Sequence, residues 1–243
     1  MAAGLGTRMK SALPKHLHPI LGRRMVDWVL AAAQELELGR VVVVASSSTA
    51  DLFPGLDVAV QERPLGTGDA VRSARELLEG RADEVLVLSG DTPLLTSALL
   101  AKLVEAHRHD KATATVLSFC PEDVRSYGRV LRDEKGHVSA IVEAGDASPD
   151  ELAVREVNSS IYVFRAEQLW SALEQLEPAN AQGELYLTDA IRSLVSRGEL
   201  VSACIAEDPV ETEGVNTRAE MAVAAAVLRD RINAKHIDRK SVV

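Results

Sequence analysis

The sequence predicts an α/β fold in which helices cover both faces of a doubly wound, mixed but mostly parallel sheet. Apolar runs such as 40–45 and 112–119 lack the polar alternation of a strand that has one solvated face. Segments with apolar residues at helical spacing, such as 25–36, stand between these runs. Of the 243 residues, 47% are hydrophobic and 26% are charged, a balance that supports a sizeable core and excludes a disordered chain.

The individual elements follow from the same two patterns. A turn composition at 133–136 joins two short strands into a predicted hairpin. Trp28 and Trp170 fall at core positions of their helices, whereas His107 and His109 are expected on an exposed helix surface. The predicted helices are 25–36, 70–78, 99–107, 166–176, 188–195 and 218 to about 236, and the predicted strands are 40–45, 85–88, 112–119, 129–131, 138–142, 157–164 and 200–205.

The start of the chain departs from this pattern. Gly4, Leu5 and Gly6 are typical of the turn after the first strand of a nucleotide-binding sheet, yet only residues 1–3 precede them. Burial of about five apolar residues in such a strand contributes on the order of 8 to 15 kcal/mol, which is comparable with the whole stability of a domain. We therefore expect a truncated first strand, with the true start upstream of residue 1 or the sequence a fragment.

Charge restricts the partners. The formal net charge of −9, from 27 basic and 36 acidic residues, opposes general binding to nucleic acid or to an anionic membrane. Residues 1–26 contain no Asp or Glu, however, and include five Lys or Arg side chains. This segment indicates a local site for an anion such as a phosphate, with a solvated basic segment as the alternative. No apolar run reaches the roughly 18 residues that span a bilayer, and no secretory signal begins the chain, so a cytoplasmic location is expected.

A glycine loop lies within the basic segment. The Gly4-x-Gly6 pattern alone is weak, because Met9 replaces the third glycine of a dinucleotide fingerprint and no Walker A lysine follows. Arg8 and Lys15 make it more specific. Glycines let backbone N–H groups approach triphosphate oxygens, and the two cations supply positive charge where pyrophosphate would leave.

The two cysteines do not indicate a metal site. Cys120 and Cys204 lie far apart without a CxxC spacing, and no histidine cluster accompanies them. We expect both to be small buried side chains in a reducing compartment.

Several segments together resemble the sugar-nucleotide pyrophosphorylases. Residues 2–25, AAGLGTRMKSALPKHLHPILGRRM, are most similar to the bacterial N-acetylglucosamine-1-phosphate uridyltransferases, which form the N-terminal half of a bifunctional enzyme. Further segments occur in that family's order and extend the similarity to about Arg218: VQERPLGTGDAV, LSGDTPLL, SYGRV, IVEAGDA, EVNSSIYVF, NAQGELYLTD and GVNTR. The resemblance implies a Rossmann-like nucleotide-diphospho-sugar transferase fold with a small β-hairpin subregion.

The resemblance also implies an activity and a domain organisation. The reaction would be uridylyl transfer from UTP to N-acetylglucosamine 1-phosphate, giving UDP-N-acetylglucosamine and pyrophosphate for the cell envelope. Residues 1–217 would form the nucleotidyltransferase domain, and residues 218–243 a C-terminal helix or tail. The family's left-handed β-helix acetyltransferase domain is not expected, because no hexapeptide repeats precede Val243. Expected partners are the two substrates, with no nucleic acid or membrane and a possible homo-oligomer.

Residue roles carry over by the same resemblance. Arg8 and Lys15 would be catalytic, and Asp91 and Asn216 would hold Mg²⁺ through side-chain oxygens. Taken alone, Asp91 and Asn216 would equally be helix or turn caps, and Gly66 to Gly68 an ordinary loop. The implied nucleotide-binding residues are Ala2, Ala3, Gly4, Gln61, Gly66, Thr67, Ser89 and Gly90.

The sugar phosphate would be held by residues from the second half of the chain. Without the family, Tyr186 would be interpreted as core and Glu143 as a solvated strand residue. Gly145 stands where many relatives carry a basic residue, and Ser160 replaces a frequent glycine. Two alternatives remain open: a pyrophosphorylase for another pair of sugar 1-phosphate and nucleotide, or an inactive truncated fragment. The implied sugar-phosphate residues are Gly128, Glu143, Asn158, Tyr186 and Thr188.

Overall fold

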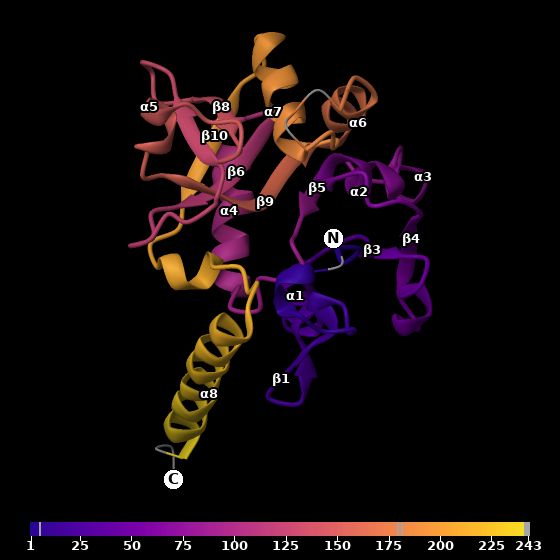
Figure 1. Ribbon diagram of the computed structural model, residues 1–243, viewed down its shortest axis with the longest axis vertical. Helices are drawn as coiled ribbons and strands as arrows, with labels where there is room; N and C mark the ends of the chain where they lie inside the picture. The colour runs from indigo at the N-terminus through magenta and orange to yellow at the C-terminus, as the bar shows by residue number, and fades with distance from the viewer. Residues whose placement is uncertain (5, 179, 181, 241–243) are drawn as a thin grey trace.

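The computed structural model describes residues 1–4, 6–178, 180 and 182–240; Leu5 of the glycine turn and Ala181 of the NAQGELYLTD segment lie outside the described residues. One mixed sheet carries helices on both faces, a second small sheet lies beside it, and the last helix projects from the fold (Figure 1). The helices are α1 (Met25–Gln34), α2 (Thr67–Ser73), α3 (Arg75–Leu78), α4 (Ser97–Asp110), α5 (Pro149–Leu152), α6 (Ala166–Glu174), α7 (Leu187–Ser196) and α8 (Arg218–Lys240). The strands are β1 (Pro19–Ile20), β2 (Arg23–Arg24), β3 (Val42–Ser46), β4 (Asp57–Gln61), β5 (Glu84–Val87), β6 (Ala114–Phe119), β7 (Arg129–Arg132), β8 (Val138–Val142), β9 (Val157–Arg165) and β10 (Val201–Ile205).

The main sheet confirms the predicted mixed α/β architecture. Its strands follow the order β10-β6-β9-β7-β8, with β5 also paired to β9. Strand β10 runs parallel to β6, and β3 runs parallel to β4 in the small sheet. Strand β9 runs antiparallel to β5, β6 and β7, which makes the sheet less parallel than its apolar strands predict. An apolar strand indicates that both faces of the sheet are buried, but it does not indicate whether the strand runs parallel or antiparallel to its neighbours.

Two hydrophobic clusters cover the two faces of the main sheet. Val116 and Tyr162 face α2, α6 and α7, whereas their neighbours Leu117 and Ile161 face α1 and α4. This alternation is the period of two that a strand imposes on its side chains. Each such buried side chain stabilises the fold by about 1.5–3 kcal/mol, so helices on both faces are required to bury the full sheet.

The first residues lie where the truncated strand was expected. Ala2 forms a parallel bridge with Ala45 of β3, and its N–H donates to Val44 O at 2.7 Å. On the other side, Gly90 N donates to Met1 O at 2.8 Å. This short segment therefore joins β3 to the loop that follows β5, as the position of the N-terminus in Figure 1 also shows.

Some elements differ from the predictions. The single helix predicted over 70–78 is two helices, α2 and α3, which separate at Ala74, and α2 begins three residues earlier, at Thr67. Strand β4 and the β1–β2 hairpin were not predicted. In β4, Val60 is exposed while Gln61 is buried, so polarity does not report burial there.

Two side-chain expectations are wrong. His107 is buried, and its Nδ1 shares a 2.9 Å hydrogen bond with Thr115 Oγ1, because it continues the apolar stripe of Leu100 and Leu103 on α4. Cys120 is exposed because it follows the last residue of β6, whereas Cys204 is partly buried. His109 is exposed and Trp170 is buried, both as predicted.

Helix α8 is attached to the fold by apolar contacts and by a hydrogen bond from Arg231. Ala224 and Leu228 pack against Ile20 and Met25, and the Arg231 guanidinium donates to Leu94 O at 2.6 Å. No helix among the described residues combines the length and the apolar character needed to cross a membrane.

Candidate functional site

Lys15 joins two side chains that are distant in sequence. Its ammonium donates to Asp91 Oδ2 and, at 2.8 Å, to Asn216 Oδ1. Arg8 Nη2 also donates to Asn216 Oδ1 at 2.8 Å. We call these four residues the cation cluster. A carboxylate oxygen and an amide oxygen therefore share one cation, the Lys15 ammonium.

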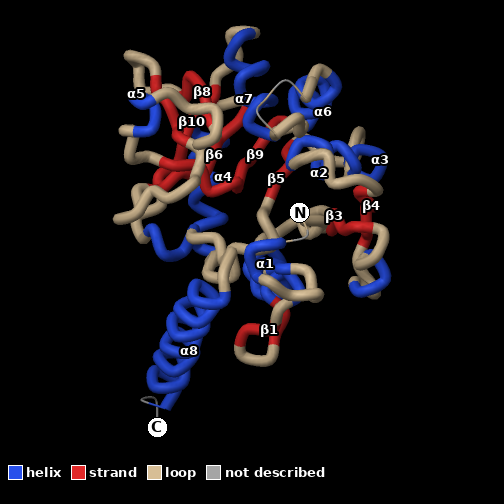
Figure 2. Tube along the Cα trace, in the orientation of Figure 1, coloured by secondary structure: helices blue, strands red, loops and turns tan. Residues whose placement is uncertain are grey.

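Loops hold the cation cluster in place. Ser89 Oγ donates to Asp91 Oδ1 at 2.6 Å, and Asp91 O accepts from Val215 N at 2.8 Å. The loop after β5 and the loop before α8 thus lie side by side near α1 (Figure 2). Glu220 fixes the second loop, because its Oε2 accepts from the backbone N–H of Asn216 at 2.6 Å.

Gly6 allows the glycine turn to lie against Lys15. Its φ is +64°, a left-handed conformation that favours glycine. A Cβ on Gly6 would collide with Lys15 Cβ, which belongs to the stiff start of the lysine side chain. Only glycine therefore fits this close approach, whereas an added Cβ at Gly4 would meet nothing within 4 Å.

The charges of the cluster are set by burial and by its neighbours. Burial alone would raise the pKa of Asp91, but the Lys15 ammonium and the Ser89 hydroxyl outweigh it and hold that pKa below its ordinary value. Burial lowers the pKa of His16 to about 4, so this neighbour of Lys15 is neutral at pH 7. Its Nε2 has no partner in the described part of the chain. The positive charge at the cluster comes from Arg8 and Lys15.

The predicted base-binding residues lie together at the end of β4. Gln61 Nε2 donates to Gly66 O at 3.1 Å and to Asp69 Oδ2 at 2.9 Å. Gly66 has a φ of +116°, and a Cβ there would lie 2.5 Å from Leu185 O. Thr67 Oγ1 accepts from Leu187 N at 2.9 Å. The loop is therefore held against the segment that leads into α7.

Three of the five predicted sugar-phosphate residues, Glu143, Tyr186 and Thr188, help to line a hollow of about 450 Å³, which we call the sugar hollow. Thr188 Oγ1 donates to Glu143 Oε1 at 3.2 Å. Gly128 lies next to this carboxylate, since a Cβ on it would be 3.4 Å from Glu143 Oε2, and its carbonyl accepts from Asn158 N at 2.8 Å. The structure thus brings Gly128, Asn158 and Thr188 together around Glu143, and Tyr186 lines the same hollow as Glu143 and Thr188.

The sugar hollow is anionic. Among the described residues that line it, Glu143, Asp146, Glu177 and Asp189 stand against one cation, Arg192. Burial raises the pKa of Glu143, and the nearby carboxylates act in the same direction. The protein therefore buries this carboxylate at a cost, and the partly buried Glu143 is not the solvated strand residue that its type alone suggests.

Four of the remaining predicted nucleotide residues, Ala2, Ala3, Gly4 and Gly90, have no polar side chain and could offer a ligand only their backbone. Ala2 and Ala3 direct their side chains into the core. Gly90 lies so close to Met1 that a Cβ would be 2.8 Å from Met1 O. Gly4 and Arg8 are exposed, so both are accessible to a ligand.

Sequence analysis missed three residues that support these groups. Asp69 binds Gln61, Tyr127 Oη accepts from Gly214 N at 3.2 Å, and Glu220 anchors Asn216. Only Glu220 had a recognisable signal, because Thr217-x-x-Glu220 is a capping-box pattern and the reciprocal bonds of 2.9 and 3.2 Å form.

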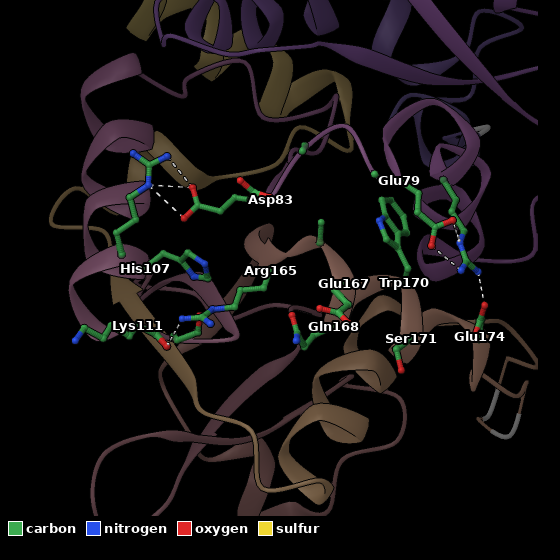
Figure 3. A pocket seen from close by; sticks show the side chains of 17 residues that line it. Glu79, Asp83, His107, Lys111, Arg165, Glu167, Gln168, Trp170, Ser171 and Glu174 are labelled. Atoms are coloured by element: carbon green, nitrogen blue, oxygen red, sulfur yellow. Dashed lines mark hydrogen bonds and ion pairs between the residues drawn. The ribbon is translucent and has the colours of Figure 1, made fainter.

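A second hollow, of about 810 Å³, lies at the opposite end of β9 (Figure 3). None of the predicted site residues lines it. Its charged side chains are largely paired with one another: Arg75 with Glu79 and Glu174, and Arg108 with Glu84. Its size alone therefore does not make it the functional site.

Among the described residues, no group of three or more His, Cys, Asp or Glu side chains is placed to hold a metal ion. A metal at the cation cluster would rest on the oxygens of Asp91 and Asn216. Hard oxygen ligands of this kind suit Mg²⁺, which keeps its other positions for phosphate and water.

Comparison with known proteins identifies the family to which this chain is similar. Residues 1–196 match the model described as "MobA-like NTP transferase domain". A relative named "Bifunctional protein GlmU" from Trichlorobacter lovleyi is 46% identical over 239 residues, which cover 96% of this chain and 52% of the relative. A relative of the same name from Pelotomaculum thermopropionicum is 46% identical over 96% of this chain and 52% of the relative. Another from Lactococcus lactis subsp. cremoris is 42% identical over 98% of this chain and 53% of the relative. The chain thus spans about half the length of the curated relatives it matches.

Proposed function

Because this chain belongs to the family of MobA-like NTP transferase domains and is a nucleotidyltransferase, we propose that it transfers the uridylyl group of UTP to N-acetylglucosamine 1-phosphate. The products are UDP-N-acetylglucosamine and pyrophosphate. The ordered family segments support the substrates, as does the identity of 42–46% to the GlmU relatives. We assign the transferase to residues 1–217 and the C-terminal helix and tail to 218–243.

One observation carries the proposal: Lys15 binds Asp91 and Asn216 at once, although 76 and 201 residues separate it from them. Cap residues, the alternative for Asp91 and Asn216, have no reason to face a common cation. Their convergence beside the glycine turn fits a site that neutralises phosphates.

The family implies a divalent metal, and we propose Mg²⁺ on Asp91 Oδ2 and Asn216 Oδ1. These oxygens fit the ion because they already gather around the Lys15 ammonium. Bound there, the metal would neutralise phosphate oxygens of both substrates and orient them.

The reaction needs charge neutralisation more than proton transfer. A phosphate oxygen of the sugar phosphate attacks the α-phosphorus of UTP, forming a new P–O bond as the bond to the β-phosphate oxygen breaks. The attacking phosphate has a second pKa near 6 and is already largely dianionic at neutral pH, so it requires no general base. Arg8 and Lys15 hold the negative charge that leaves with pyrophosphate.

The sugar hollow supplies orientation. Its carboxylates, among them Glu143 and Asp189, accept hydrogen bonds from hydroxyl and acetamido groups and repel a phosphate. The neutral ring therefore enters the hollow, and the phosphate points away from it, toward the cations.

Pyrophosphate release over a grid of nucleotides and sugar 1-phosphates tests the proposal. We expect the highest kcat/KM for UTP with N-acetylglucosamine 1-phosphate, and loss of activity with a chelator that excess Mg²⁺ restores. A higher kcat/KM for another pair would identify that pair as the substrates and leave the proposed reaction type unchanged. No release with any pair contradicts the proposal.

A further inference from the structure

Gln61 turns the nitrogen of its amide toward the base-binding loop and α2, which leaves the amide oxygen on the opposite side. Its Nε2 donates to Gly66 O at 3.1 Å and to Asp69 Oδ2 at 2.9 Å. A carbonyl and a carboxylate can only accept hydrogen bonds, so the amide nitrogen must face them. The direction of this amide thus follows from the chemistry of its two partners.

The amide oxygen is left as a free acceptor. Gln61 is 5% exposed, yet within the described residues its Oε1 has no hydrogen-bond partner and is not sealed from solvent. A buried side chain that keeps one accessible, unused acceptor is prepared to bind a donor from a ligand.

Asp69 is itself held between two donors. Arg72 Nη2 donates to Asp69 Oδ1 at 2.6 Å, while Gln61 donates to the other oxygen. The Asp69 side chain is 13% exposed, and Ser73 Oγ donates to its carbonyl at 2.9 Å. Only a carboxylate accepts on both sides, so no neutral side chain of this size keeps both bonds.

We propose that Asp69 is a positioning residue that sets nucleobase choice, because it fixes Gln61 with its oxygen toward the base. Uracil offers an N3–H donor to that oxygen, whereas cytosine carries an unprotonated N3 that repels it. The inference rests on the proposed function in one respect, which is that the nucleotide binds with its base beside Gln61.

Asp69→Asn tests this with almost no change of shape. The amide that replaces the carboxylate has one acceptor and one donor, and the donor-only Arg72 attracts its oxygen. The new NH₂ group then faces the Gln61 Nε2 donor. Gln61 therefore loses one of the two acceptors that fix its amide, and the amide turns over toward the base at the expense of its remaining bond to Gly66 O. We expect the ratio of the UTP and CTP dissociation constants, measured by titration calorimetry with Mg²⁺, to shift about tenfold toward CTP. The same shift should appear in KM, with a much smaller change in kcat.

Two further variants separate positioning from a general structural effect. When Asp69→Asn is combined with Arg72→Leu, the oxygen of the new amide is free to return to Gln61, so most of the UTP preference should recover. Asp27→Asn on α1 is the matched control, because Asp27 also pairs with an arginine three residues away, Arg24. This control should keep the wild-type ratio.

The outcomes are distinguishable. Asp69→Asn with the wild-type melting temperature and the wild-type ratio overturns the inference alone. Equal losses of UTP and CTP affinity also overturn it, since they show a scaffold role. A wild-type protein that does not distinguish UTP from CTP removes both this inference and the uridine specificity of the proposed function.

Discussion

The cation cluster and the sugar hollow are built on opposite principles. The cluster takes Arg8 and Lys15 from two 3₁₀ turns and Asp91 and Asn216 from loops, and it gathers two cations in a chain that carries a net negative charge. The sugar hollow takes its residues from the end of β8 and the loop after it, from the segment that follows α6 and from α7, and carboxylates outnumber cations among them.

Under the proposed function, this difference would let one site hold a substrate with unlike ends. The cluster would attract phosphates and the hollow would repel them, while the hollow would accept a neutral sugar ring through directional hydrogen bonds. Charge would then set the direction of the substrate, and hydrogen-bond geometry its identity. Variants of each region should accordingly fail in different ways.

The largest effect is expected on the charged side. Lys15→Ala and Asp91→Ala should each lower kcat/KM by about 10³-fold, the upper range for loss of a group that stabilises developing charge. Each change also strands a partly buried charge and lowers the melting temperature. The Lys15→Ala/Asp91→Ala double variant should recover stability without recovering activity. Near-normal rates in the folded single variants would contradict the assignment.

Gly6→Ala tests whether the cluster needs its turn. The added Cβ collides with Lys15 and occupies a φ of +64°, so the ammonium must move. A displacement of this kind costs on the order of 10²-fold in rate when it misplaces a reacting group. Gly39→Ala, where a Cβ meets nothing within 4 Å, is the control. Equal kcat/KM in the two variants would show that the turn does not position Lys15.

Glu143→Gln should act with opposite signs on activity and stability. A sugar hydroxyl loses a charged acceptor, and KM for the sugar phosphate should rise about tenfold. The folded-state pKa of Glu143 lies above the ordinary 4.5, so ionisation costs stability as pH rises through the interval between the two values. The variant should therefore melt higher than the wild type above that interval and lose the advantage below about pH 4.5. A lower melting temperature at pH 8 would contradict this account.

The smallest effect concerns Ser160, two residues after the predicted sugar-phosphate residue Asn158. Ser160 has a φ of +63° at the β6–β9 register shift, and its N–H donates to Asn158 Oδ1 at 2.9 Å. Ser160→Gly should relieve about 1 kcal/mol of backbone strain and raise the melting temperature by about 2–4 °C. Ser159→Gly should instead lower it, because the Ser159 hydroxyl donates to Leu117 O at 2.5 Å. A lower melting temperature in both variants would mean that Ser160 is unstrained.

Periodicity predicted most of the fold because it reports burial directly. Helices α1 and α4 and strands β6 and β9 lie within a few residues of their predicted ranges. Strand direction and the missed strand β4 depend on which neighbours assemble, which no local pattern contains. His107 was misjudged by its polarity, although its spacing from Leu100 and Leu103 follows the buried stripe.

The candidate site could likewise be predicted from the sequence only in part. Family segments identified Lys15, Asp91 and Asn216 as candidates, yet their shared hydrogen bonds depend on two loops that meet only after folding. Asp69 could not be predicted from the sequence because its partner Gln61 lies eight residues away, at the end of a strand. No regular helix or strand brings two side chains at this spacing into contact.

The hydrogen bonds from Lys15 to Asp91 and Asn216 also bear on the protein before its substrates bind. The Lys15 ammonium holds the side-chain oxygens of Asp91 and Asn216 together and neutralises the charge of the Asp91 carboxylate. Asp91 and Asn216 would therefore already be assembled to hold a metal, and the Lys15 ammonium that the metal displaced would stay close enough to serve as a counterion for the nucleotide phosphates.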